Sequence, residues 1–511
     1  MFFTVHSSKS PLTSSSNFPK AFLIRDNWDD FYFKTSFLLQ VFDEAGVSHL
    51  LGTVKVGKFG MQKSGDLSPQ IPEGFDVLDD GFFSLGQGES YYGGLMQLNT
   101  SVRYQILNGL RDVVADLSLF NKAIEERVTK VSLLRDVTPM TVSGQFRRLL
   151  DGGARLSAYD FSYQVQNQGG SSIPWIVLNF EVKPESNPPT NVHVLIGSNG
   201  VGKTRILNYM SLSLVDRNAL PNQFGIFTSR GGKSNSEFFA NLVSVSFSAF
   251  DDFTPLHENN DKTDGIKYSY IGLKPFRSID EDNIYRPKTT QELTQEFANS
   301  VNACRRGDRA NRWKKSVEML ESDPVFKEAS ITSLSNNNDN EKAYQIFEKL
   351  SSGHKVVLLT ITRLVETVEE RTLVLLDEPE AHLHPPLLSA FVRTLSELLV
   401  YRNGVAIIAT HSPVILQEIP KSCVWKLRRN GSEAIAERPE IETFGENVGT
   451  LTREVFGLEV TQSGFHKLLQ DAVNQNKSFK QTMQMFDNEL GSEARAILRA
   501  LIVERDSEEE M

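Results

Sequence analysis

The residues whose types and spacing best suit chemistry form one glycine-rich run. The run reads Gly197, Ser198, Asn199, Gly200, Val201, Gly202, Lys203 and Thr204. It matches the pattern G-x-x-x-x-G-K-[ST], in which glycines let backbone N–H groups curl around phosphates at a helix N-terminus. In that pattern Lys203 brings a positive charge to the β- and γ-phosphates, and the Thr204 hydroxyl ligates Mg²⁺. The run therefore predicts a binding site for ATP and Mg²⁺.

Two adjacent acids, Asp377 and Glu378, end the apolar run Leu373–Leu376. A buried parallel strand is apolar on both faces, and ligands bind at the carboxyl ends of such strands. We expect Asp377 to hold Mg²⁺ through water and Glu378 to act as the general base that polarises the attacking water. Apolar strands that end in two acids are common by themselves, so the glycine-rich run is what makes this pair informative.

A third motif, Leu350-Ser351-Ser352-Gly353-His354, resembles the signature of ABC-type ATPases. The commonest form of that signature is LSGGQ, and this chain has serine for the first glycine and histidine for the glutamine. The resemblance implies that Ser351, Ser352 and Gly353 meet the γ-phosphate bound by a second copy of the chain, at a helix N-terminus. The alternative interpretation is an ordinary serine N-cap without a ligand.

Two further segments resemble ABC-type motifs. Pro379–Pro385 looks like the D-loop in the form DEPExxLHP, and transporter ATPases usually carry Leu-Asp where this chain has Leu383-His384. This form resembles the non-transport branch of the family, the RecF-like, SMC-like and OLD-like ATPases. His411, within Thr410–Pro413, resembles the switch histidine, which contacts the γ-phosphate and helps to hold Glu378 and water in place.

One expected motif of the family is missing. The Q-loop glutamine should follow the strand at Val243–Ser248, but no glutamine stands there. In its place, Ser248 or Asp251 binds Mg²⁺ or orients the attacking water, or neither residue does so. The full set of Mg²⁺ ligands is therefore open beyond Thr204 and Asp377.

The elements that must position these residues form an alternating series. Apolar, strand-like runs at Val192–Ile196, Val243–Ser248, Thr372–Leu376 and Val405–Thr410 are separated by helical segments. Such alternation predicts an α/β fold with a parallel sheet, here an ABC-ATPase head in which helices flank a P-loop sheet. We expect an N-terminal α+β elaboration (1–165), a lobe with the glycine run (166–254), an inserted loop and helical region (255–345), a lobe with the signature, Asp377 and His411 (346–435), and a mainly helical C-terminal segment for partner docking (436–511).

Bulk composition sets further limits. A chain of 511 residues favours two or three structural units. It contains no run of about 18 apolar residues and no secretory leader pattern, so we expect a cytoplasmic protein without a membrane span. Cys304 and Cys423 are the two cysteines, without metal-ligand spacing, and indicate neither a disulfide framework nor a zinc site. The net charge of −10 disfavours wrapping of nucleic acid by the whole surface.

One basic cluster stands out against that acidic background. It consists of Arg305, Arg306, Arg309, Arg312, Lys314 and Lys315. One interpretation is a solvated helix face. The other is contact with a DNA backbone, which would give steep salt dependence.

Chain length narrows the branch of the family. SMC-like ATPases need hundreds of residues of coiled coil between the glycine run and the signature, and here 145 intervene. OLD-like nucleases append a Toprim domain, but only 100 residues follow His411, so we expect no intrinsic nuclease. The remaining layout is similar to the ATPase subunit of Septu-type anti-phage systems. Less specific matches to that group are Phe82–Gly86 with Tyr91-Tyr92, Ser132–Arg135, and Val455–Glu459 with Ser463–His466.

This resemblance implies a homodimer or higher homo-oligomer with composite ATP sites and a separate HNH nuclease gated by nucleotide state. The alternative is a RecF-like or SMC-like DNA-repair ATPase that clamps DNA directly. An energising subunit of a membrane transporter ranks below both, because the Q-loop and the Leu-Asp of the D-loop are altered.

Overall fold

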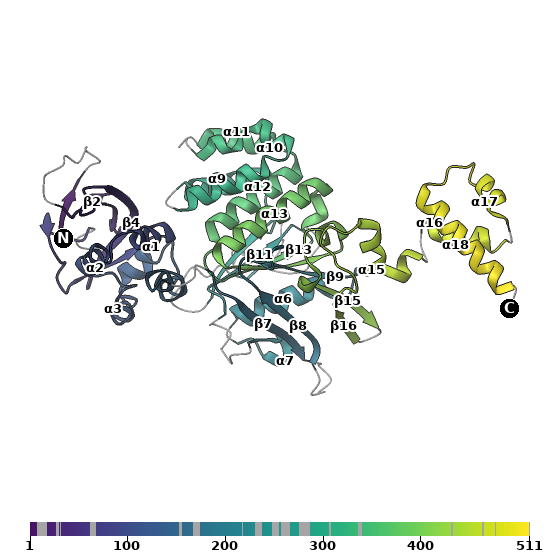
Figure 1. Cartoon of the computed structure of the whole chain (residues 1–511), viewed down its shortest axis with the longest axis horizontal. Coiled ribbons are helices and arrows are strands. Elements are labelled where there is room, and N and C mark those ends of the chain that lie inside the picture. Colours follow the sequence, from purple (N-terminus) through teal and green to yellow (C-terminus); the bar gives the residue numbers. More distant parts are fainter. Residues whose placement is uncertain are drawn as a thin grey trace, which may run out of the picture.

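The computed structural model describes residues 1–7, 18–26, 30, 32–61, 68–152, 156–166, 174–216, 218–229, 238–247, 255–256, 266–274, 287–305, 308–335, 340–430, 433–461, 464–475 and 477–509. Figure 1 shows an N-terminal unit, a central head that carries the largest sheet, and a small group of C-terminal helices at the opposite end. Among the helices in these ranges, none combines the length and the apolar character that crossing a bilayer requires.

The N-terminal unit is a six-stranded sheet packed against short helices. The strands, in the order β5-β1-β2-β3-β4-β6, are β1 (Phe2–His6), β2 (Lys20–Arg25), β3 (Ser36–Phe42), β4 (Ser48–Lys58), β5 (Gly74–Phe75) and β6 (Phe82–Gly86). The helices are α1 (Glu89–Gln97), α2 (Thr100–Gly109), α3 (Leu117–Ala123), η1 (Thr129–Leu133), α4 (Pro139–Thr141), η2 (Val142–Phe146) and α5 (Arg147–Leu150). Their apolar faces share one core, in which Phe83, Tyr91 and Tyr92 are buried.

The head is built on a seven-stranded sheet in the order β12-β11-β13-β14-β9-β15-β16. Its strands are β9 (Val192–Ile196), β11 (Asn241–Ser246), β12 (Lys267–Gly272), β13 (Thr372–Asp377), β14 (Val405–Thr410), β15 (Val424–Asn430) and β16 (Glu433–Glu437). All neighbours are parallel except β15 and β16. Every residue of β9, β11, β13 and β14 is buried, as the apolar runs predict for strands covered on both faces.

Two different layers cover the faces of this sheet. Val374 and Leu376 pack in the core of the helical layer, formed by α8 (Thr290–Cys304), α9 (Asp308–Leu320), α10 (Pro324–Ala329), η4 (Ile331–Ser335), α11 (Asn340–Lys349), α12 (Ser352–Thr367) and α13 (Pro385–Arg402). Leu373 and Leu375 pack on the opposite face. There lie α6 (Lys203–Val215), α7 (Pro221–Phe224) and an antiparallel sheet of β7 (Tyr159–Gln166), β8 (Pro174–Val182) and β10 (Ile226–Thr228). Alternate residues of β13 therefore hold the two layers together.

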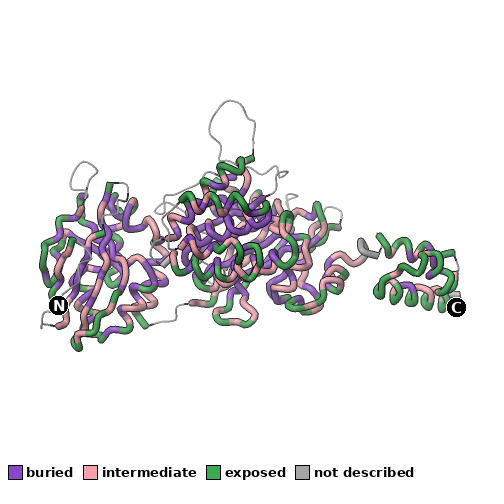
Figure 2. Tube along the Cα trace, turned by 90° about the horizontal axis from the view of Figure 1, so that it is seen from above, coloured by how far each residue is buried: buried purple, intermediate pink, exposed green. Residues whose placement is uncertain are grey.

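The last part of the chain is helical. After η5 (Pro379–His382), α14 (Pro413–Leu416) and η6 (Lys421–Cys423), it contains α15 (Val448–Thr461), α16 (Gly464–Val473), α17 (Phe479–Met485) and α18 (Ser492–Glu509). Leu469, Val473, Met483 and Leu498 form a small core of their own. Figure 2 shows that these helices are mostly exposed, whereas the head is buried at its centre.

The predicted fold class, an ABC-ATPase-like P-loop head with a parallel sheet, is confirmed. The domain boundaries at 165, 254, 345 and 435 stay predictions. The first of them falls inside β7, which pairs with β8 of the head along its length.

The interpretation of the basic cluster as a solvated helix face is wrong for two of its residues. Arg309 and Arg312 of α9 do not lie on a solvated helix face, because the N-terminal unit and the neighbouring helices of the head surround them. Lys314 and Lys315 are exposed, and Arg306 lies outside the described residues.

Candidate nucleotide-binding site

The glycine run lies between β9 and α6, at the carboxyl edge of the sheet. Gly200 and Gly202 have φ angles of 80° and 97°, which residues with a side chain rarely adopt. At Gly197 a Cβ atom would lie 2.2 Å from the carbonyl oxygen of Leu427, so a larger residue does not fit there. These three glycines bring the backbone into a turn at the N-terminus of α6, the arrangement that binds phosphates.

Lys203 is nearly buried inside this loop. Its Nζ atom donates hydrogen bonds to the carbonyl oxygens of Gly197 at 2.8 Å and of Ser198 at 3.1 Å. Burial lowers the pKa of Lys203, and the nearby acids, Glu378 first among them, oppose that shift. The ammonium is therefore held within the loop that phosphates would enter.

The two predicted metal ligands meet. Asp377 is the last residue of β13, and its Oδ1 atom accepts a hydrogen bond from Thr204 Oγ1 at 3.1 Å. The two residues are 173 positions apart in the sequence and come together because β13 and the loop after β9 end at the same edge. A hydroxyl beside a carboxylate is an oxygen donor set that suits Mg²⁺, so these residues fit the predicted ion.

Glu378 begins a tight turn directly after Asp377. Its backbone has φ 44° and ψ 56°, a left-handed conformation that is strained for a residue with a side chain. Its N–H donates to the carbonyl oxygen of Ala409 at 2.9 Å, which ties the turn to β14. Its side chain is part-exposed, and its Oε1 atom lies 3.6 Å from Nδ1 of His411. The structure thus places the predicted base beside the predicted switch histidine.

Glu380 is a site residue to which the sequence assigned no role. Its Oε1 atom accepts hydrogen bonds from the Thr410 hydroxyl at 2.5 Å and from the His411 N–H at 2.8 Å, and it lies 3.3 Å from His411 Nδ1. One buried carboxylate therefore holds both the backbone and the ring of the switch segment. Glu380 could have been recognised in the sequence as a third acid close to the pair Asp377 and Glu378.

The signature segment lies at the start of α12, where Ser351 and Ser352 are exposed and Gly353 is buried. A Cβ atom on Gly353 would lie 2.4 Å from the carbonyl oxygen of His382, so this glycine lets α12 pack against η5. Ser351 is the N-cap residue, but its side chain caps no backbone N–H. Ser351 Oγ instead lies 2.6 Å from Nδ1 of His354, the residue at the position of the usual glutamine.

The histidine continues this chain of polar contacts. His354 Nε2 lies 3.2 Å from Oδ1 of Asp323, the N-cap of α10, and His384 Nε2 lies 3.9 Å from Oδ2 of the same carboxylate. The ligand atoms of these three residues lie within 4.8 Å of one another, as a metal site would require. His384 Nδ1, however, accepts the N–H of Leu387 at 3.4 Å, which places its proton on Nε2. We therefore interpret Asp323 and His354 as a hydrogen-bonded pair that orients Ser351, with His384 lying beside them.

The position of the missing Q-loop glutamine is only partly described. Ser246 ends β11 in register with Asp377, so the chain leaves the sheet beside the predicted metal ligand. The two alternatives, Ser248 and Asp251, lie outside the described residues.

Known proteins support the class that this geometry indicates. Residues 248–417 match the family model described as "AAA domain, putative AbiEii toxin, Type IV TA system". The match begins after the glycine run and spans the signature, Asp377, Glu378 and His411. Together with the fold, it defines the chain as an ATPase of the ABC/AAA type.

One relative with a similar length identifies the family of this chain. Protein ea59 of Escherichia phage lambda is 43% identical over 513 residues, which cover 95% of each chain. The chain therefore belongs to the ea59 family.

Solved structures are more distant. An ATP-binding cassette of an ABC transporter in its ADP conformation is 16% identical, with a TM-score of 0.31, and covers 60% of this chain and 100% of its own. An inward-facing metal-chelate-type ABC transporter is 14% identical, with a TM-score of 0.28, and covers 58% of this chain and 88% of its own.

Proposed function

We propose that the chain hydrolyses Mg-ATP as a homodimer or higher homo-oligomer and that its nucleotide state controls a separate HNH nuclease in anti-phage defence. The hydrolytic part of this proposal rests on the 3.1 Å contact between Thr204 and Asp377, with Glu378 and His411 directly beside it. Mg²⁺, when bound by Thr204 and Asp377, would neutralise charge on the phosphates.

The chain's own residues have separate roles in this proposal. The glycine-loop N–H groups and Lys203 bind the phosphates, and Glu378 accepts a proton from the attacking water. Glu380 holds His411, and His411 in turn restricts the carboxylate of Glu378 and the water. The left-handed turn at Glu378 leaves this side chain partly exposed, whereas that of the preceding Asp377 is buried.

The signature supports a site shared between two copies. Ser351 and Ser352 are exposed at the N-terminus of a sixteen-residue helix, where backbone N–H groups and the helix dipole favour an anion. The γ-phosphate held by a second copy is the anion that we propose for this surface. A head-to-head dimer would then contain two complete sites.

The nuclease partner is supported by the sequence resemblance to Septu-type ATPases and by the C-terminal helices. These helices expose Phe465, Leu468, Met485 and Val503 around a small core. Exposed apolar side chains can take part in a protein interface, and we propose these four for docking of the nuclease. Direct clamping of DNA has less support, because Lys314 and Lys315 lie beside Glu318 and Glu397.

Two variants test the ATPase. Glu378→Gln should bind ATP, accumulate as a dimer and lose turnover by about a hundredfold or more, because general bases contribute that much. Lys203→Ala should not bind ATP. Turnover of Glu378→Gln at the wild-type rate, or retained ATP affinity in Lys203→Ala, would contradict the assigned roles.

The nuclease arm is tested by co-expression with an HNH protein encoded beside the gene, if one is present. We expect co-purification, with plasmid cleavage that changes when Lys203→Ala replaces the wild type. Cleavage that is indifferent to this substitution would refute the nucleotide gate while leaving the ATPase intact.

A further inference from the structure

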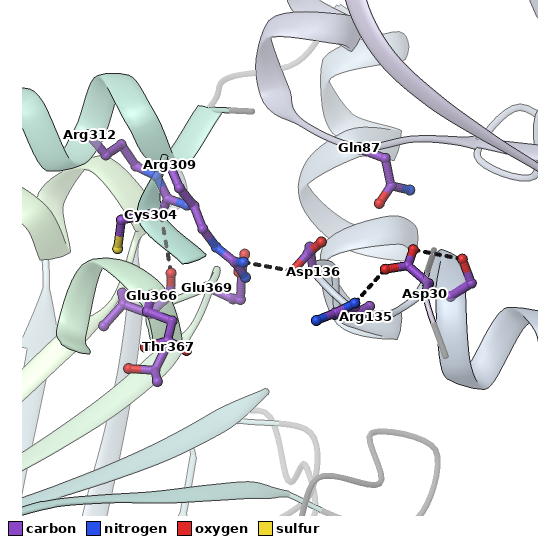
Figure 3. Close-up of polar contacts among 12 residues, drawn as sticks. Asp30, Gln87, Arg135, Asp136, Cys304, Arg309, Arg312, Glu366, Thr367 and Glu369 are labelled. Atoms are coloured by element: carbon purple, nitrogen blue, oxygen red, sulfur yellow. Dashed lines mark hydrogen bonds and ion pairs between the residues drawn. The ribbon is translucent and has the colours of Figure 1, made fainter. Parts of the chain in front are cut away.

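A cavity of about 590 Å³ lies between the N-terminal unit and the head, away from the glycine loop. Figure 3 shows its two walls: Arg309 and Arg312 come from the head, whereas Gln87, Arg135 and Asp136 come from the N-terminal unit. Its volume is in the range of cavities that bind small ligands. Arg305, Arg309 and Arg312 of the basic cluster line this cavity, and none of the three has a role in the proposed hydrolysis of ATP.

The cavity is strongly cationic. The N-terminal unit contributes Arg25, Lys55 and Arg135, and the head contributes Arg305, Arg309, Arg312 and Arg402. Two lining carboxylates, Asp26 and Asp136, oppose these seven cations. Three further acids pair with them from behind the wall, namely Asp30, Glu89 and Glu369. Counted over the described residues alone, these seven cations exceed the five acids by two.

Arg312 is the clearest sign of an absent counter-charge. Its side chain is 6% exposed, and its Nη1 atom donates to the carbonyl oxygen of Val368 at 3.2 Å. Its Nε atom is buried and has no hydrogen-bond partner among the described residues, and the same holds for Nε of Arg402. Burial, followed by repulsion from Arg402, lowers the pKa of Arg312 to about 9. A buried guanidinium without a carboxylate is costly unless an anion joins it.

The opposite wall offers an acceptor instead. Gln87 donates from Nε2 to the carbonyl oxygens of Leu85 and Leu133, which fixes the orientation of its amide. Its Oε1 atom is buried and has no partner in the described part of the chain. A ligand that fits both walls therefore carries at least two negative charges for the arginines and an N–H or O–H group for Gln87.

We propose that this cavity binds a small phosphorylated molecule of nucleotide size, with its phosphate on Arg312 and Arg309. The ligand would bridge the two units beside the existing ion pair between Arg309 and Asp136, which measures 2.6 Å. It would thereby fix how the N-terminal unit is held against the ATPase head. The site is separate from the ATP site and does not depend on the proposed nuclease.

The test uses the full chain with Lys203→Ala, so that the glycine loop does not contribute. Inorganic pyrophosphate and AMP are titrated by calorimetry and by thermal shift. We expect binding of at least one probe, with affinity reduced at least tenfold by Arg312→Met and also by Arg25→Gln, which lies on the other wall. Lys315→Met, an exposed substitution on the same helix, should leave the affinity unchanged.

The melting temperature of the Arg312 variant distinguishes a ligand-binding role of this residue from a purely structural one. Because no ion pair joins the buried Arg312 to an acid in the described part of the chain, Arg312→Met should keep or raise the melting temperature of the ligand-free protein while it weakens the response to the probes at least tenfold. The proposal is overturned if neither probe binds, or if Arg312→Met and Arg25→Gln both leave binding intact. It is also overturned if a 5′-phosphorylated DNA oligonucleotide binds in an Arg312-dependent way and the small probes do not.

Discussion

Glu380 offers the sharpest test of how the switch segment is held. Its carboxylate accepts hydrogen bonds from the Thr410 hydroxyl at 2.5 Å and the His411 N–H at 2.8 Å, and it faces the His411 ring at 3.3 Å. The side chain is 8% exposed, so water cannot readily replace these contacts. Glu380→Ala removes all of them, whereas Glu380→Gln keeps one neutral acceptor oxygen.

The expected magnitude follows from the charge of the acceptor. A hydrogen bond to a charged group contributes about 1.5–3 kcal/mol, and a neutral one about 0.5–1.5 kcal/mol. If one charged bond is needed to keep His411 in place during hydrolysis, Glu380→Ala lowers kcat roughly 10- to 150-fold. Glu380→Gln should lower kcat by about tenfold at most.

The assay is steady-state ATP hydrolysis with kcat and KM determined separately, alongside direct binding of ATP. ATP affinity should stay within about twofold of wild type, because Glu380 holds the switch segment rather than the loop that binds phosphates. Glu397→Ala, which removes a surface carboxylate from α13, is the matched control and should be silent. Wild-type kcat in Glu380→Ala would refute the assigned role, as would equal losses of kcat in the alanine and glutamine variants.

Two further predictions concern stability. Gly353→Ala would place a Cβ atom 2.4 Å from the His382 carbonyl oxygen, so we expect a loss of about 1–3 kcal/mol in unfolding free energy together with reduced turnover; Gly93→Ala, in open space on α1, should be neutral or stabilising by about 0.5–1 kcal/mol. Unfolding midpoints in urea report both values, and equal midpoints for the two variants would contradict the packing argument. Burial raises the pKa of Asp112 from 3.8 to about 7, so the folded state keeps this proton where the unfolded state has lost it. The unfolding free energy should therefore fall by at most about 4 kcal/mol between pH 4 and pH 7, as measured by urea unfolding at each pH. Asp112→Asn should make this decrease smaller, and an equal decrease in the variant would show that the pKa of Asp112 is not raised.

The sequence could predict the head because buried parallel strands are apolar on both faces. The strands predicted at Val192–Ile196 and Val405–Thr410 have those bounds, and the strand predicted at Thr372–Leu376 extends one residue further, to Asp377. Since these strands end at one edge, the residues that follow them had to come together. Local pattern and topology thus suffice for the central part of the site.

The parts that could not be predicted depend on contacts between distant segments. Asp323 reaches His354 because it caps α10, and no spacing in the sequence signals that pairing. The burial of Arg309 and Arg312 arises because a second unit covers α9. The charge pattern of a helix does not reveal whether water or another unit lies against it.

We propose that each ATP site is completed by a second copy of the chain. The most direct measurement mixes two inactive variants, Lys203→Ala and Ser351→Ala, under conditions that let subunits exchange. In a shared-site dimer, half of the mixed population is heterodimeric and each heterodimer holds one intact site, so activity should return to about a quarter of wild type. Activity that stays at the sum of the two separate variants would contradict a shared site.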